Sequence, residues 1–217
     1  MSPRPWWLSP AGPGGLHPGV RSRENPAIAG HREILTVGHS NHEERPFIEL
    51  LEGAGVTVLA DVRANPRSRY EHFNRSPLAA SLSAAGILYE HLGQELGGRR
   101  TRVESSPNDG WDDDAFRGYA DHMATPEFEH GLERLERLAE DPPARADGAG
   151  GRAAIMCAEA DWTHCHRRLL ADALLERGWR VLHLGSDGSL DEHELTPFAS
   201  REDGRLVYPA EQTSLEL

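Results

Sequence analysis

Residues 153–184, AAIMCAEADWTHCHRRLLADALLERGWRVLHL, contain two short apolar runs separated by a segment with apolar residues at helical spacing. The runs at 153–157 and 179–184 have the length and composition of buried strands, and the segment 164–177 predicts a helix. Gly178 follows it as a helix stop. A strand, a helix and a second strand in this order are typical of parallel pairing, because the helix returns the chain to the starting edge of the sheet. This stretch therefore predicts an α/β fold.

The same alternation extends toward the N-terminus. Continuous apolar strands are buried on both faces of a parallel sheet. We therefore expect a single, Rossmann-like α/β domain with about five mostly parallel strands and helices on both faces. The further strands are expected at 33–37, 56–61 and 87–91; helices are expected to begin at Asn41, at Ser76-Pro77 and at Thr125-Pro126, and another covers 112–123.

The composition shifts along the chain define the expected organisation. Residues 1–31 are rich in Pro and Gly and lack periodicity, which predicts a disordered or loosely packed N-terminal extension. The α/β domain is expected over 32–200, with a flexible loop insertion at 141–151 (DPPARADGAGG). Residues 201–217 are polar and are expected to form a C-terminal tail.

Charge and residue usage exclude several classes of protein. The 217 residues carry 23 basic and 35 acidic side chains, for a net charge of −12, which argues against sequence-independent coating of nucleic acid. Every basic side chain is Arg, so Schiff-base chemistry and a phosphate loop that needs Lys are excluded. Two cysteines cannot form a multi-disulfide scaffold. No apolar run is long enough to span a membrane, and the first residues lack the apolar centre of a secretory signal. We expect a cytoplasmic protein with free thiols, no cofactor and no membrane partner.

Polar residues follow the predicted strands, and in an α/β sheet this edge is where ligands bind. After the first strand, Gly38 is followed by His39, Ser40 and Asn41, a turn that suits phosphate. The alternative is that Asn41 caps the following helix while His39 and Ser40 satisfy backbone groups.

The segment after the second strand carries a local excess of positive charge. Four Arg and two acids lie between Asp61 and Arg75, and Arg side chains bind phosphate or carboxylate with two hydrogen bonds. The alternative is that Asp61 pairs with an Arg to hold the loop. The candidate ligand-binding residues here are Asp61, Arg63, Arg67, Ser68, His72 and Asn74, to which the loop after the third strand adds Gly97, Gly98 and Arg99.

The segment 157–167, CAEADWTHCHR, runs from a strand end into a helix start. A helix N-terminus favours anions and lowers the pKa of a nearby thiol, so Cys157 or Cys165 is a candidate nucleophile. His166 is placed to move a proton, Glu159 to act as general acid or base, and Arg167 to hold an anion. Packing of both thiols in the core is the alternative.

Two further readings of this region remain open. Cys157, His164, Cys165 and His166 combine thiols and imidazoles that suit zinc, although their spacing matches no zinc motif, and we expect no bound metal. The hydroxyl of Tyr119 is a candidate ligand contact over the cleft, with a half-buried packing role as the alternative.

These segments resemble a bacterial family catalogued only as domain of unknown function number 488. The similar pieces extend from Ile34 to Leu184, nearly the whole expected domain, whereas the N-terminal extension and the loop 141–151 are additions. The family name carries no established activity, so the resemblance implies the domain and its strand-end motifs but no reaction. The pieces are TVGHSN (36–41), DVRANPRSR (61–69), HFNR (72–75), HLGQELGGRR (91–100), FRGYADHM (116–123), TPEF (125–128) and MCAEADWTHCHRRLLAD (156–172).

A more limited resemblance is to rhodanese-type sulfurtransferases, which also have Asp-Val-Arg after an early strand and a Cys at the end of a later one. It implies a persulfide-carrying role for Cys157. In that class an Arg lies about five residues after the Cys, whereas here Thr163 is near that position and the first Arg is Arg167.

The sequence thus predicts a protein that binds a small anionic, phosphate- or nucleotide-like ligand at the strand edge, either as a thiol-dependent enzyme or as a non-enzymatic module for a nucleotide or nucleic acid. In the second case Tyr70, His72 and Phe73 supply stacking surfaces. A purely structural role for the motifs is the third hypothesis.

Overall fold

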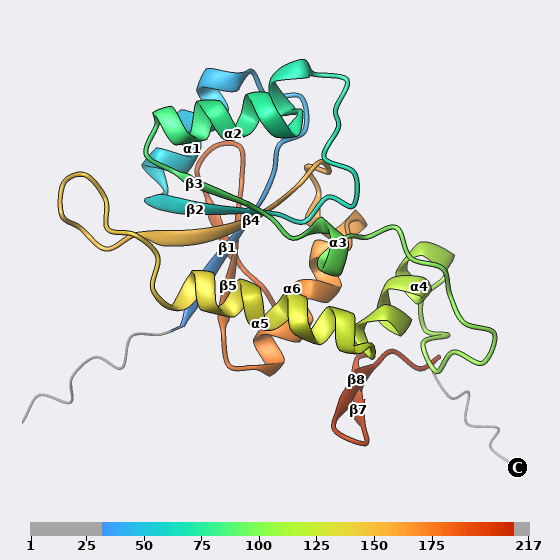
Figure 1. Cartoon of the computed structure of the whole chain (residues 1–217). Coiled ribbons are helices and arrows are strands. Elements are labelled where there is room, and N and C mark those ends of the chain that lie inside the picture. Colours follow the sequence, from blue (N-terminus) through green and yellow to red (C-terminus); the bar gives the residue numbers. More distant parts are fainter. Residues whose placement is uncertain (1–31, 211–217) are drawn as a thin grey trace, which may run out of the picture. The chain divides into compact units, whose positions relative to one another are not determined.

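A computed structural model describes residues 32–210; the expectations for residues 1–31 and 211–217 lie outside this range. The described chain forms a six-stranded sheet with the order β3-β2-β4-β1-β5-β6 (Figure 1). The first five strands are parallel and β6 is antiparallel to β5, so the predicted α/β fold with a mostly parallel sheet is confirmed. The strands are β1 (Glu33–Gly38), β2 (Val56–Asp61), β3 (Leu88–His91), β4 (Arg152–Cys157), β5 (Arg180–Leu184) and β6 (Leu190–Glu192).

Helices cover both faces of the sheet. On one face α1 (Glu44–Gly53) and α2 (Arg75–Ala84) pack against the sheet, and on the other lie α5 (Pro126–Glu140) and α6 (Arg167–Glu176), as Figure 1 shows. The remaining helical elements are α3 (Gly93–Leu96), α4 (Asp114–Met123) and the 3₁₀ turns η1 (Glu71–Phe73) and η2 (Trp162–His164).

The central strands are buried because alternate side chains enter two separate cores. Leu35 of β1 packs with Phe47 and Leu82 of the first helical layer. Ile34, its neighbour in β1, packs instead with Leu169 of α6 and with the second layer. Burial of each such side chain stabilises the folded state by roughly 1.5–3 kcal/mol. A strand that is buried on both faces therefore has apolar residues at nearly every position.

Several element boundaries differ from the prediction. The helix expected to begin at Asn41 begins at Glu44, its N-cap residue Glu43 makes no side-chain cap bond, and Asn41 is exposed in the preceding turn. Helix α6 begins only at Arg167, because η2 occupies 162–164. The predicted start at Thr125 is confirmed, since its hydroxyl accepts the N–H of Phe128.

The sheet has six strands, one more than the approximate number of five expected from the sequence. Strand β6 is exposed and polar, and so it lacks the apolar run by which buried strands are recognised. Residues 141–151 form an exposed loop between α5 and β4. Within the expected tail, β7 (Ser200–Glu202) and β8 (Arg205–Val207) form a small antiparallel hairpin, and Tyr208 behind it is fully buried.

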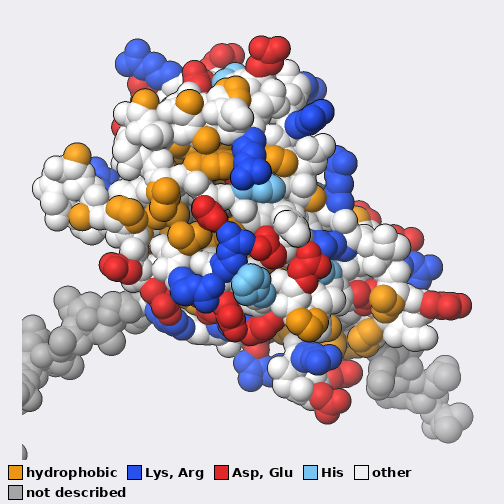
Figure 2. Space-filling model, viewed as in Figure 1, with side chains coloured by type: hydrophobic (Ala, Val, Ile, Leu, Met, Phe, Trp, Pro, Cys, Tyr) orange, Lys and Arg blue, Asp and Glu red, His pale blue; other side chains and the backbone are white. Residues whose placement is uncertain are grey.

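The surface mixes both signs of charge. On the face drawn in Figure 2, basic and acidic side chains are interspersed. Many are paired between elements: Arg177 of α6's C-terminal end, for example, bonds Glu136 of α5 at 2.8 Å. In the described part of the chain, no helix combines the length and apolar character that crossing a membrane requires.

Candidate functional site

The carboxyl ends of the central strands bring the predicted segments to one edge of the sheet. Gly38 of β1 is level with Cys157 of β4, and Asp61 of β2 is level with both Met156 of β4 and His91 of β3. The placement expected from the parallel-sheet rule is therefore observed.

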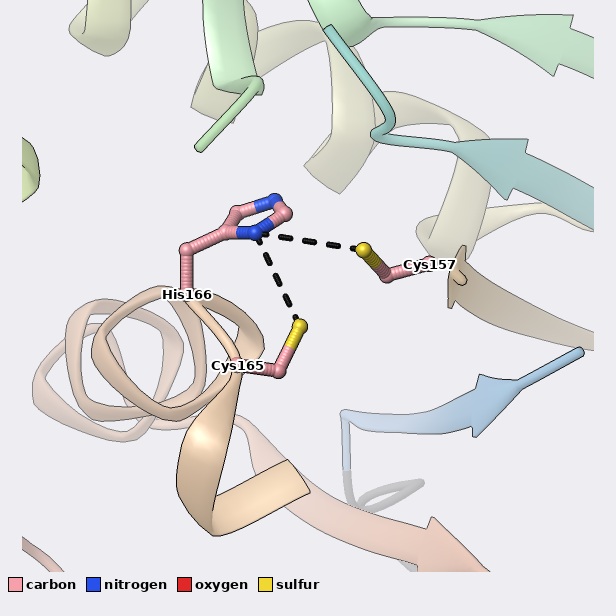
Figure 3. Close-up of side chains that lie close together, drawn as sticks. All are labelled: Cys157, Cys165 and His166. Carbon is pink, nitrogen blue, oxygen red and sulfur yellow. Dashed lines mark hydrogen bonds between the residues drawn. The ribbon is translucent and has the colours of Figure 1, made fainter. Parts of the chain in front are cut away.

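At this edge two thiols and an imidazole converge (Figure 3). Cys157 comes from the end of β4, and Cys165 and His166 come from the segment that enters α6. Nδ1 of His166 lies 3.9 Å from Sγ of Cys157 and 3.7 Å from Sγ of Cys165, and the three polar atoms all lie within 4.8 Å of one another. Both thiols are buried and free.

The orientation of the His166 ring is set by its other nitrogen. Nε2 lies 3.3 Å from the carbonyl oxygen of Val62, so the proton of a neutral ring is on Nε2 and the lone pair of Nδ1 faces the two sulfurs. The ring is packed between neighbours. A Cβ on Gly98 would lie 2.4 Å from Nδ1, and the ring of Tyr119 is 5.1 Å away. Gly98 is thus required for the close approach of its loop to the imidazole.

The two thiols differ in acidity. A hydrogen bond from Cys157, with help from the bond to His166 and the charge of Arg167, holds the pKa of Cys165 well below its usual value despite burial. The same bond, together with burial, raises the pKa of Cys157. Of the two thiols, Cys165 is therefore the one that ionises more readily.

Arg167 lies behind the thiols and is 2% exposed. Its guanidinium donates to the carbonyl oxygens of Glu159 and Ala160 and, at 3.4 Å, to the hydroxyl of Thr36. No carboxylate among residues 32–210 pairs with it, and its Nε–H has no hydrogen-bond partner there. Because the guanidinium is used to hold the 158–161 loop, it does not reach into the pocket as predicted; its charge instead favours a nearby thiolate.

A pocket of about 370 Å³ opens beside the thiols. Its walls include the exposed side chains of Arg67 and Arg99, neither of which forms an ion pair within the described residues, and the exposed carboxylate of Glu159. The pocket thus joins the predicted catalytic segment to three of the predicted Arg, of which Arg67 and Arg99 are exposed and Arg63 is buried. The full lining is Arg63, Ala64, Asn65, Arg67, Gly98, Arg99, Asp113, Ala115, Phe116, Cys157, Ala158, Glu159, His164, Cys165 and His166.

Asp61 and Arg63 form a buried ion pair. This is the structural role that the sequence offered as the alternative to ligand binding. Nε and Nη2 of Arg63 bond the two carboxylate oxygens at 2.9 and 2.6 Å, and Nη1 donates to the Phe73 carbonyl at 2.8 Å. The Tyr89 hydroxyl donates to Asp61 as well, at 2.7 Å. The carboxylate and most of the guanidinium are therefore occupied within the protein.

His39, Ser40 and Asn41 lie outside the pocket. The His39 ring stacks on Phe73 at 4.2 Å, its Nδ1 lies 3.0 Å from the Ser40 carbonyl, and Nη1 of Arg63 lies 3.1 Å from its Nε2. Burial and the charge of Arg63 lower the pKa of His39 to about 4, so the ring is neutral at pH 7. Ser40 adopts a left-handed conformation (φ 44°) in the turn.

The other predicted residues shape the loops around the pocket. Oδ1 of Asn74 accepts the Ser68 N–H at 2.8 Å, and Nε2 of His72 donates to the His42 carbonyl at 3.0 Å. A Cβ on Gly97 would clash with the backbone of Gly93 at 2.3 Å.

Tyr119 does not reach the pocket. It is fully buried and donates its hydroxyl to the Leu96 carbonyl at 3.1 Å, so the contact predicted over the cleft is not formed.

A second buried polar cluster was not predicted. The Thr36 hydroxyl lies 2.7 Å from Nδ1 of His183, Nε2 of His183 lies 3.0 Å from Nδ1 of His193, and Nε2 of His193 lies 2.8 Å from the Asp172 carboxylate. Burial and the nearby His193 and Arg167 lower the pKa of His183 to about 3. A polar residue inside an otherwise apolar run, as at Thr36 and His183, is the signal that would have identified these positions.

Comparison with known proteins identifies a family. The model of a family described as domain of unknown function DUF488 matches residues 44–174. No curated protein and no solved structure is similar enough to this chain to match. The matched range contains α1, β2 and β4, both thiols, His166 and Arg167. Because it covers more than half of the chain, the protein belongs to the DUF488 family.

Proposed function

We propose that the protein is a thiol-dependent enzyme that acts on a small anionic, phosphate- or nucleotide-like molecule at the carboxyl edge of its sheet. The observation that carries the proposal is the position of His166 Nδ1, which has the sulfurs of two thiols on the wall of a pocket as its hydrogen-bond partners. Thiols are weak hydrogen-bond partners, so this arrangement adds little to stability but places a base beside two candidate nucleophiles.

In this proposal Cys165 is the nucleophile. Its thiol gives a proton to Nδ1 of His166, and the resulting thiolate is stabilised by the charge of Arg167 and a hydrogen bond from Cys157. The thiolate attacks an electrophilic atom of the substrate and forms a bond to it. The group displaced there takes the proton back from His166. Glu159, exposed on the pocket wall, is available as a second acid or base.

Arg67 and Arg99 are the proposed anion contacts. Both line the pocket, both are exposed, and neither has an acidic partner among residues 32–210. Arg binds phosphate or carboxylate in a forked geometry, and few of its donors are used here by the protein itself. A cytoplasmic location is part of the proposal, because a reactive thiol pair requires a reducing compartment.

The first test is the rate at which each thiol is alkylated by iodoacetamide at pH 7, read by peptide mass spectrometry. Cys165 is expected to react about tenfold or more faster than a thiol in an unstructured peptide. His166→Gln should remove most of the difference, whereas His164→Gln, the adjacent exposed histidine, should not. Inorganic phosphate should slow the wild-type reaction. Slow alkylation of both thiols, unaffected by His166→Gln, would rule the proposal out.

A second candidate function is a binding module for nucleotide or nucleic acid without thiol chemistry. The observation that favours it is a group of three Arg outside any ion pair of the described residues, Arg67, Arg69 and Arg75, around the half-buried Tyr70. The guanidinium of Arg69 lies 4.9 Å from the centre of the Tyr70 ring. This function predicts binding of a single-stranded oligonucleotide that weakens steeply with salt and is lost in Arg69→Gln. No binding at low salt would exclude it.

A further inference from the structure

We propose that Cys157, Cys165 and His166 form a binding site for a thiophilic divalent cation, with Zn²⁺ as the natural probe and a fourth coordination position open to the pocket. This goes beyond the expectation from the sequence that no metal is bound. The three polar atoms face a common point, as Figure 3 shows, and lie within 4.8 Å of one another.

The two distances from the imidazole nitrogen to the sulfurs are close to those of tetrahedral coordination. Zn–S bonds of about 2.3 Å and Zn–N bonds of about 2.0–2.1 Å place the ligand atoms of a tetrahedral site about 3.5–3.8 Å apart. Nδ1 of His166 lies 3.7 Å from Cys165 Sγ and 3.9 Å from Cys157 Sγ. A metal would therefore require movements of only a few tenths of an ångström at these contacts.

The surroundings of the imidazole match those of a metal ligand. Its Nε2 faces the backbone carbonyl of Val62 at 3.3 Å, which fixes the tautomer with a free lone pair on Nδ1. Histidines that bind metals usually donate their second N–H to a carbonyl or carboxylate in this way. The close approach of Gly98 on one side and Tyr119 on another limits rotation of the ring.

The charges of the ligands also balance the charge of the cation. Binding of Zn²⁺ exchanges the metal for the protons of the two thiols, so that two thiolates neutralise the cation and the imidazole stays neutral. The buried charge of Arg167, which no carboxylate of residues 32–210 neutralises, favours loss of these protons. Cys157, Cys165 and His166 all line the pocket, so the fourth position is accessible to water or to an anion held by Arg67 and Arg99.

One consequence rests on the proposed function. A bound cation uses the same lone pairs as the thiolate nucleophile and its base, so Zn²⁺ would act as a reversible inhibitor of the thiol chemistry. The metal site itself does not depend on that function, because coordination needs only the three side chains and their geometry.

The test uses the full chain, reduced and treated with a chelator that is then removed, and titrated with Co²⁺. One equivalent should produce the cobalt–thiolate charge-transfer absorption and the visible bands of a tetrahedral site, and Zn²⁺ should displace it. Cys157→Ser, Cys165→Ser and His166→Gln should each lose or greatly weaken these bands, whereas His164→Gln should retain them. Wild-type protein without such bands, or bands that persist in Cys165→Ser, would overturn the proposal.

A second measurement uses the wild type and so does not depend on whether the variants fold. It also distinguishes the metal site from the proposed thiol enzyme. In the wild type, one equivalent of Zn²⁺ should protect both thiols from iodoacetamide, and chelator should restore the rate. Fast alkylation that Zn²⁺ does not slow would overturn the metal site and leave the proposed enzyme intact. Tight Co²⁺ binding with slow alkylation of the metal-free protein would support the metal site and remove the thiol enzyme.

Discussion

Arg167 lies between two buried polar clusters that differ in how their hydrogen bonds are used. On one side Thr36, His183, His193 and Asp172 form a continuous chain. On the other, His166 and the two thiols leave a nitrogen lone pair and two sulfurs facing one another beside a pocket. Buried polar groups are costly unless paired, so the first cluster stabilises the fold. In the second cluster Nδ1 of His166 has only the two sulfurs as partners, which leaves these groups available for chemistry.

The direction of the bonds explains why the first cluster is inert. Arg167 donates to Thr36, which donates to His183; His183 donates to His193, and His193 donates to Asp172. Thr36, His183 and His193 thus each donate once and accept once along the chain, and the cation and the carboxylate lie at opposite ends. The Trp162 ring stacks on His183 at 3.9 Å and covers the chain.

Removal of the carboxylate at the end of this chain has the largest expected effect on stability. Asp172 accepts bonds from His193, from the Thr196 N–H and from the Tyr208 hydroxyl. Asp172→Ala leaves three buried donors unpaired and should lower the free energy of unfolding by about 3–5 kcal/mol, measured by urea denaturation. The exposed Asp109→Ala is the control. A loss under about 1 kcal/mol would mean that the chain is not structural.

The same chain of hydrogen bonds should also make the stability of the protein depend on pH, with a smaller effect than that of Asp172→Ala. The folded-state pKa of His183 is about 3, below the unfolded value of 6.5. The neutral ring is therefore favoured by folding, and its contribution to stability is complete above pH 6.5 and declines as the pH falls toward 3. Between pH 6.5 and 5 the wild type should lose up to about 1.4 kcal/mol per pH unit from this group. His183→Gln should show a shallower slope, and equal slopes in both proteins would contradict this account.

A substitution in the thiol cluster should have the opposite balance of effects, with a small change in stability and a large change in thiol reactivity. His166→Gln removes one hydrogen bond to Val62 and should cost about 1 kcal/mol or less. The same change should reduce the alkylation rate of Cys165 by about tenfold, because the base beside the thiol is lost. Stability from urea denaturation and the rate from mass spectrometry are measured on the same sample. A large loss of stability with an unchanged alkylation rate would show that His166 has a structural role instead.

Arg67→Gln should have the smallest effect on the fold. Its guanidinium is exposed and forms no ion pair with another described residue, so the free energy of unfolding should change by less than about 0.5 kcal/mol. Phosphate should nevertheless protect Cys165 less well in this variant, with the basal alkylation rate unchanged. Arg45→Gln, on the exposed face of α1, is the matched control for removal of one positive charge. Equal phosphate protection in both variants would remove Arg67 from the anion site.

Much of the fold follows from patterns that are local in the sequence. The apolar runs at 33–37, 56–61 and 153–157 identify central strands, because a strand that is buried on both faces has mostly apolar side chains. The exposed strand β6 lacks this pattern and was not predicted. The helix start at Asn41 was wrong because a cap signal does not show where the turn before the helix ends.

The candidate site was only partly accessible to such reasoning. The strand-end rule located Cys157, Cys165, His166, Gly98, Arg67 and Arg99, all of which line one pocket. It did not separate them from Arg63, whose guanidinium is occupied by Asp61, or from Tyr119, which is buried under the loop.

The sequence by itself determined the order of strands and helices and the set of polar residues at one sheet edge, because periodicity and strand ends are properties of short segments. Only the tertiary structure decided which of these groups are paired. Asp172 meets His193 and Tyr208 across 21 and 36 residues of chain, and His166 meets the Val62 carbonyl across 104. Such contacts depend on how helices pack on the sheet, and they determine which polar groups remain free for chemistry.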